Sequence, residues 1–241
     1  MTRYRFVGPR FPTFQRKDGV KQMLVPLPRC ELCFKPIKAG FEKSTGQCYD
    51  CYTGSPVDGE ILERVIAATL YVPRVTGYPH SQEIRRLKDN GEFADQYAHV
   101  LLHVCQAEGV ELDSDDILVP IPRTTLLPWI SGPDALADEL SKLSGLPVRK
   151  ALSFNRVVQR QKGLSPTDRK RNVENSMDCD GSVKGRTVFL VDDVLTTGHT
   201  MREGARAAKG AGAKSAIGLV AGRDSAIEYL VYVGVMTVVQ E

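Results

Sequence analysis

The sequence lacks any apolar run close to the ~20 residues that a membrane-crossing helix needs. Residues 1–19 are basic, but they contain no apolar stretch of the kind found in secretory signals. Repeats and low-complexity tracts are also missing. We therefore expect a globular protein that acts in the cytoplasm without membrane insertion.

The net charge is also small, because the chain has 32 basic and 29 acidic residues, which give +3 at pH 7. The distribution of charge is more informative than the total. Residues 149–172 contain eight Lys or Arg and a single acid, Asp168. Such a run attracts polyanions, although a solvated loop is the simpler alternative.

Four of the six cysteines form two pairs with the pattern CxxC–x14–CxxC, at Cys30, Cys33, Cys48 and Cys51. Disulfides are unusual in the cytoplasm, and four thiolates at this spacing can surround a tetrahedral zinc ion. Few aliphatic residues are available nearby, so the metal would supply the folding energy. A redox role for one pair is the alternative, but it leaves the second pair unexplained. We predict a structural Zn²⁺ site with no open coordination position.

The chain divides into three predicted parts: an irregular basic arm (1–29), a four-cysteine zinc module (30–56) and an α/β domain (57–241). Buried strands are predicted at 69–75, 117–119, 188–191 and 214–221, with an edge strand in 229–239. Helices are predicted at 58–68, at 81–104 with Ser81 as cap and Gly91 as a break, at 133–145 and at 200–209. This alternation indicates a parallel sheet flanked by helices.

The segment 187–200, TVFLVDDVLTTGHT, contains the main functional motif. A fully apolar strand ends at Asp192 and Asp193, and ligands in parallel sheets bind beyond the carboxyl ends of strands. The following turn, 196–200, is rich in hydroxyls and leads into a helix, whose N-terminus attracts phosphate. A sugar phosphate would satisfy both parts of the motif, with its hydroxyls bound by the two carboxylates and its phosphate bound by the turn. The alternative is an Asp-rich turn with a Thr helix cap and no ligand.

This string resembles the signature of type I phosphoribosyltransferases, which bind phosphoribosyl pyrophosphate (PRPP). The resemblance implies the type I phosphoribosyltransferase fold and a requirement for Mg²⁺. Hypoxanthine-guanine enzymes carry Asp where this chain has Thr196, which argues against a 6-oxopurine acceptor. The chain also has no N-terminal nucleophilic Cys, as glutamine amidophosphoribosyltransferases require.

Further motifs resemble the ComF family, which is linked to DNA uptake in natural competence. They are the paired cysteines, the IRRLK segment at 84–88, VPIP at 119–122, and QKGL at 161–164 followed by RKRN at 169–172. The resemblance covers roughly residues 30–223. It departs from the family at 124–133, where an Arg-Gly-Phe-Asn-Gln segment is replaced by TTLLPWISGP.

The two resemblances imply roles for individual residues. Asp192 and Asp193 would hold the ribose hydroxyls and Mg²⁺, and Arg169 and Arg171 would assist departure of pyrophosphate from a mobile basic loop, 153–172. No general base is evident, so positioning and electrostatics would carry the rate. His199 could contact phosphate, but we expect it to face solvent. The remaining predicted PRPP contacts are Thr196, Thr197, Gly198 and Thr200 for the 5′-phosphate, Pro120, Ile121, Pro122 and Arg123 for pyrophosphate, and Lys88 and Gln161.

Three functions remain open at this stage. The first is a phosphoribosyltransferase with an unknown acceptor, and another is a nucleobase salvage enzyme. The remaining one is a PRPP-sensing module that binds single-stranded DNA or a helicase of the uptake machinery. In that case aromatic side chains of the zinc module would stack on bases, although they are more simply explained as a cover for the zinc site; they are Phe34, Phe41, Tyr49 and Tyr52. A homodimer is one option for assembly.

Overall fold

The computed structural model describes residues 3–6, 13–25, 28–37, 44–52, 57–73, 78–123, 131–158, 166–225 and 236–239. In the described part of the chain, no helix is both long enough and apolar enough to cross a membrane.

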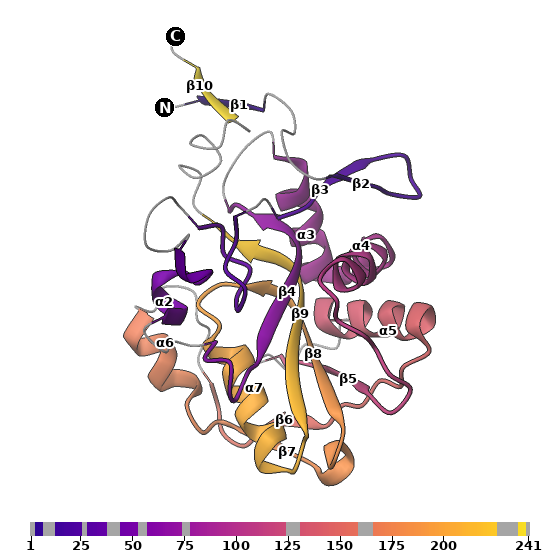
Figure 1. The fold of residues 1–241 in the computed structure, drawn as a ribbon, viewed down its shortest axis with the longest axis vertical. Helices are drawn as coiled ribbons and strands as arrows, with labels where there is room; N and C mark the ends of the chain where they lie inside the picture. The colour runs from indigo at the N-terminus through magenta and orange to yellow at the C-terminus, as the bar shows by residue number, and fades with distance from the viewer. Residues whose placement is uncertain are drawn as a thin grey trace.

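The core is a four-stranded parallel sheet with the order β4-β9-β8-β5 (Figure 1). Its strands are β4 (Arg64–Tyr71), β9 (Ser215–Asp224), β8 (Thr187–Leu195) and β5 (Ile117–Pro120). Their interiors are apolar and buried, as expected for a parallel sheet that is covered on both faces. The predicted α/β architecture is confirmed.

Helices cover the two faces of the sheet (Figure 1). One face packs against α3 (Pro79–Asn90), α4 (Ala94–Ala107) and α5 (Gly132–Ser144), and the other against α7 (His199–Gly210). Gly91 ends α3 in the left-handed conformation, with φ of 78°, so the predicted break in this helix is confirmed. The predicted cap is wrong: α3 begins at Pro79, and Ser81 instead accepts a hydrogen bond from the Val72 N–H at 2.9 Å.

The smaller elements lie between β5 and β8 in sequence. They are β6 (Leu152–Phe154) and β7 (Met177–Cys179), which pair antiparallel, together with α6 (Pro166–Val173) and the 3-10 turn η1 (Gly181–Val183). The predicted loop 153–172 is therefore not a loop throughout, because its last part is helical. Residues 159–165 lie outside the described residues.

Three further predictions differ from the structure. Residues 58–63 form a turn rather than the start of a helix, and β4 begins at Arg64, because pairing with β9 overrides the local helical pattern. The arm 1–29 is not irregular throughout, since it contains β1 (Arg3–Phe6) and the hairpin of β2 (Thr13–Gln15) and β3 (Lys21–Met23). β10 (Met236–Val239) pairs with β1 and does not extend the parallel sheet.

The cysteine-containing segment packs beside β4. The Val65 N–H donates to the Leu32 carbonyl at 2.6 Å, which continues the polar edge of the sheet into this segment. Arg29 lies 4.4 Å from the centre of the Phe34 ring and pairs with Glu108 at the end of α4. The segment is thus attached to the domain through backbone and ionic contacts.

Candidate functional site

The turn after β8 presents the N-terminus of a long helix. β8 ends at Leu195, and α7 begins at His199 with Gly198 as its N-cap residue. Gly198 has φ of 84°, a left-handed conformation that side chains disfavour. Its carbonyl accepts the Arg202 N–H at 2.9 Å, which begins the hydrogen bonding of α7. The N-terminus of a helix carries a partial positive charge that attracts an anion.

A hollow lies at this end of the sheet. Residues of the strand end, the turn and the first turn of α7 line it: Asp192, Val194, Leu195, Thr196, Thr197, Gly198, Thr200 and Met201. Asp192 and the start of α7 therefore line one hollow. His199 is partly buried at the first position of α7, so it does not simply face solvent.

Asp193 occupies the other side of the strand. Successive side chains of a strand point to opposite faces, and Asp193 is 6% exposed and absent from the lining of the hollow. Its Oδ1 lies 3.4 Å from Nζ of Lys88, which comes from α3. The expectation that both carboxylates line the same hollow holds only for Asp192. The alternation of the strand explains why Asp193 instead meets Lys88.

The electrostatics of this strand end depend on four charged groups. Burial, and then the neighbouring charge of Asp193, raise the pKa of Asp192 to about 7, while Lys88 and Arg123 act in the opposite direction. Burial opposes the charge of Lys88, but Asp193 and Asp192 outweigh it and raise the pKa of the lysine. Asp192 is therefore poised to lose a proton when hydroxyl donors or a cation arrive.

The segment 120–123 runs beside the same strand end. Pro120 pairs with Val191, and the Ile121 N–H donates to the Val191 carbonyl at 2.9 Å. The Ile121 side chain is buried, and its Cδ1 lies so close to Gly204 that a Cβ there would approach it to 2.9 Å. Pro122 and Arg123 are partly buried, and Arg123 donates to the Lys88 carbonyl. The segment 120–123 thus lies next to Lys88, at the same end of the sheet as Asp192 and Asp193.

Some predicted contacts are not brought to the site by the described residues. Arg171 is exposed on α6, and only the backbone of Arg169 is described, also in α6. Gln161 lies outside the described residues, as do 124–130.

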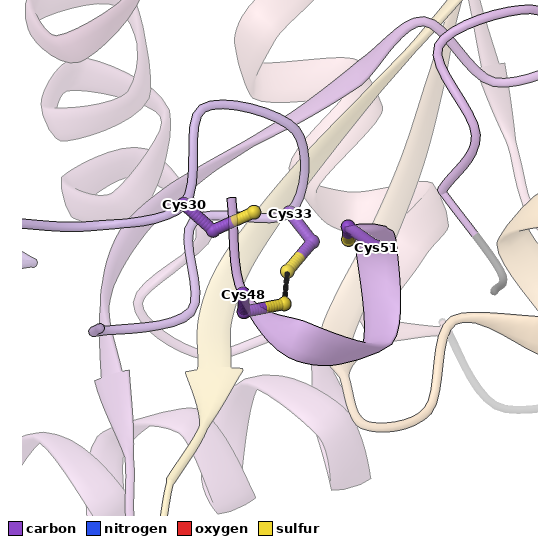
Figure 2. A group of neighbouring side chains, drawn as sticks. All are labelled: Cys30, Cys33, Cys48 and Cys51. Carbon is purple, nitrogen blue, oxygen red and sulfur yellow. Dashed lines mark hydrogen bonds between the residues drawn. The ribbon is translucent and has the colours of Figure 1, made fainter. Parts of the chain in front are cut away.

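The four cysteines form a compact, buried cluster, with Cys51 on α2 (Tyr49–Tyr52) and the others on the adjoining turns (Figure 2). Their sulfur atoms all lie within 4.8 Å of one another, and those of Cys33 and Cys48 are 3.6 Å apart. A tetrahedral zinc ion with Zn–S bonds of about 2.3 Å places sulfurs about 3.8 Å apart, so the arrangement fits. Hydrogen bonding to Cys30 raises the pKa of the Cys48 and Cys51 thiols, so ionisation of all four calls for a cation. The cluster is a possible closed zinc site.

The aromatic residues of this segment separate into two groups. Phe34 is 1% exposed and packs within the segment, as a covering residue would. Tyr49 and Tyr52, on α2, are 65% and 56% exposed, so they do not cover the cysteines. Phe41 lies outside the described residues.

Sequence reasoning did not identify Arg223, which connects the cysteine cluster to the turn. The residue is 7% exposed at the end of β9, and its guanidinium contacts the carbonyls of Cys33, Leu195 and Thr196. The only signal in the sequence was a basic residue two positions after the predicted apolar strand 214–221, and a buried arginine needs several acceptors.

Comparison with known proteins gives consistent matches. The family described as phosphoribosyl transferase domain matches residues 111–231. Competence protein F of Haemophilus influenzae is 29% identical over 195 residues, which cover 72% of this chain and 81% of that protein. DNA utilization protein YhgH of Escherichia coli K12 is 30% identical over 149 residues, which cover 58% of this chain and 63% of YhgH. Among solved structures, glutamine PRPP amidotransferase from B. subtilis matches with a TM-score of 0.36 and 20% identity, over 58% of this chain and 26% of that one.

Proposed function

Because the chain belongs to the phosphoribosyl transferase domain family and is related to competence protein F, we propose that it binds PRPP in the cytoplasm and transfers the phosphoribosyl group to a nucleophile. One observation carries the proposal: Asp192 and the N-terminal turn of α7 line the same hollow. A carboxylate accepts hydrogen bonds from ribose hydroxyls, and a helix N-terminus binds phosphate, so the two together suit a sugar phosphate.

In this proposal the turn holds the 5′-phosphate through backbone N–H groups and the hydroxyls of Thr196, Thr197 and Thr200, with His199 beside them. Gly198 permits the close approach of the backbone. Asp192 then orients the ribose so that C1 faces the segment 120–123. Asp193 acts together with Lys88, because their ion pair places a carboxylate and an ammonium at the same strand end, beside the bound sugar phosphate.

The leaving pyrophosphate would lie along 120–123, where Arg123 and Lys88 supply positive charge. Arg169, Arg171 and Gln161 would approach from the basic segment. Asp192 and Asp193 would hold Mg²⁺, because carboxylates are the oxygen ligands that the ion prefers, and the ion would supply positive charge for the pyrophosphate. A nitrogen or another nucleophile then bonds to C1, and positioning supplies most of the rate in the absence of an evident general base.

Calorimetry with PRPP and Mg²⁺ tests binding, and a screen for pyrophosphate release with free bases and amines tests transfer. We expect binding in the micromolar range and release with one class of acceptor. Turnover with a free base would assign a salvage enzyme. If PRPP binds but no acceptor leads to release of pyrophosphate, the protein is a PRPP sensor and not a transferase. If PRPP does not bind, the proposal is wrong.

The exposure of Tyr49 and Tyr52 supports a second function, binding of single-stranded DNA, in keeping with the names of the relatives. Stacking of a base on an aromatic side chain contributes about 1–3 kcal/mol. We expect the double variant Tyr49→Phe, Tyr52→Phe to retain fluorescence-detected binding of an oligonucleotide and the double alanine variant to lose at least tenfold. Equal affinities would exclude stacking on α2. A role in DNA uptake, alone or with a helicase, would follow from such binding.

A further inference from the structure

Arg223 joins two regions that are far apart in the sequence. Its Nε donates to the Cys33 carbonyl at 3.0 Å, while Nη1 donates to the carbonyls of Leu195 at 2.9 Å and Thr196 at 2.8 Å. Nη2 lies 3.9 Å from the Cys33 sulfur. One rigid, buried guanidinium therefore connects the first cysteine pair to the turn before α7.

These bonds also determine where the turn directs its donors. In a planar trans peptide the C=O and N–H groups point in opposite directions. The Leu195 carbonyl shares its peptide with the Thr196 N–H, and the Thr196 carbonyl shares its peptide with the Thr197 N–H. Both N–H groups consequently point away from Arg223, and both threonines line the hollow.

A second contact links the same two regions. Arg202, in the first turn of α7, places Nε at 3.1 Å and Nη2 at 2.7 Å from Oδ2 of Asp58. Asp58 also accepts the N–H groups of Glu60 and Ile61, in the turn that connects the cysteine segment to β4. Both the turn and the helix behind it are thus attached to the cysteine side of the molecule.

We propose that Arg223 is a positioning residue that couples the metal state of the cysteine cluster to the anion-binding turn. A bound zinc ion fixes the backbone of Cys33 and hence one end of the arginine bridge. Loss of the ion frees Cys33, so the peptides of Leu195 and Thr196 lose their common anchor. The consequence for PRPP affinity rests on the proposed function, whereas the coupling itself does not.

The test combines two changes, substitution of Arg223 and removal of zinc, and measures the hydrogen exchange of backbone amides in the absence of PRPP. Wild type and Arg223→Lys are each compared in the zinc-loaded state and after zinc chelation. Lysine keeps the charge but cannot reach both sides with a planar fork. In wild type, chelation should increase exchange at the amides of residues 196–200 at least ~5-fold, the lower end of typical coupling between sites. In Arg223→Lys these amides should exchange fast in both states.

Arg206→Gln is the matched control, because Arg206 also lies on α7 and bonds Glu203 and the Met177 carbonyl, away from the turn. It should behave as wild type. Amides of β8 at residues 189–191 report whether the sheet remains folded. If the β8 amides lose protection in Arg223→Lys, that variant is not folded, and the comparison of zinc-loaded and chelated wild type tests the coupling by itself.

Unchanged exchange at 196–200 in chelated wild type, while residues 30–33 lose protection, would overturn the coupling. Calorimetry on the same samples separates the two proposals. If PRPP binds, its affinity should fall at least ~5-fold on chelation and in Arg223→Lys. If wild type does not bind PRPP but the exchange cycle shows coupling, the proposed function fails and the role of Arg223 stands.

Discussion

The carboxyl end of the sheet and the cysteine cluster position polar groups by different means. The sheet end is held by strands of fully buried aliphatic and aromatic residues, such as Phe189, Leu190 and Val191 in β8. The cysteine segment buries four thiols among few aliphatic side chains, and we expect a bound ion to supply much of its order. The difference suggests a division that can be tested: the hydrophobic core positions one region, and metal coordination would position the other, with Arg223 between them.

Removal of one cysteine should produce the largest difference between the two regions. In Cys48→Ser we expect loss of stoichiometric zinc and of order in residues 30–52, because zinc binding contributes about 10–16 kcal/mol in small zinc domains. Metal analysis and hydrogen exchange would measure this. The sheet should keep its protected amides.

Cys179→Ser is the control, since Cys179 lies outside the cluster. A Cys48→Ser protein that retains one zinc per chain would show that the cluster is not the metal site. Unfolding of the whole sheet in that variant would show that the two regions are not held separately.

At the sheet end, Asp192→Asn should weaken PRPP binding about 100-fold, since hydrogen bonds to charged groups contribute about 1.5–3 kcal/mol. Asp193→Asn should weaken it about tenfold, because Asp193 faces Lys88 rather than the hollow. Calorimetry with Mg²⁺ measures both. Asp138→Asn, at an exposed position of α5, should change nothing. A larger loss for Asp193→Asn would reverse the assignment of the two acids.

The sequence anticipated this region well but not completely. The apolar strand, the acid pair and the turn before α7 were all located, because they follow one another along the chain. The opposite directions of Asp192 and Asp193 follow from the strand continuing through both residues to Leu195, which the motif alone does not reveal. Arg223 was missed because its partners, Cys33 and Thr196, are distant in sequence, and only the fold brings them together.

The pH dependence of PRPP binding sharpens the comparison further. Asp192 has a pKa raised to about 7 in the free protein, and ribose hydroxyls and Mg²⁺ favour its charged form. Affinity should therefore rise about tenfold from pH 6 to pH 8, as expected for a group that is one-tenth ionised one unit below its pKa. Because the pKa of Asp192 is raised relative to the unfolded chain, the contribution of Asp192 to the stability of the free protein should fall as pH rises from about 4 through 7.

The 5′-phosphate of PRPP ionises in the same pH range, so it also changes the affinity with pH. Measuring the affinity of Asp192→Asn over the same pH range gives the contribution of the phosphate alone. The slope attributable to Asp192 is the difference between wild type and variant. Identical pH profiles for the two proteins would show that this carboxyl is already charged before binding.

The smallest effect is expected from Gly198→Ala. An L-residue in the left-handed conformation costs roughly 1–2 kcal/mol, so the melting temperature should fall by a few degrees. Gly181→Ala is matched, because a Cβ there meets no atom within 4 Å. If both variants melt at the wild-type temperature, the turn adapts without strain.

The pairing of β1 with β10 has a consequence for handling the protein. Arg3 stands opposite Val239, so two strands near opposite ends of the chain run side by side and close a ring of more than two hundred residues. Figure 1 shows β1 and β10 side by side, beyond the upper end of the sheet. A short peptide joining them would span little distance, which makes the molecule suited to circular permutation, with a new opening cut in the exposed turn at 113–115.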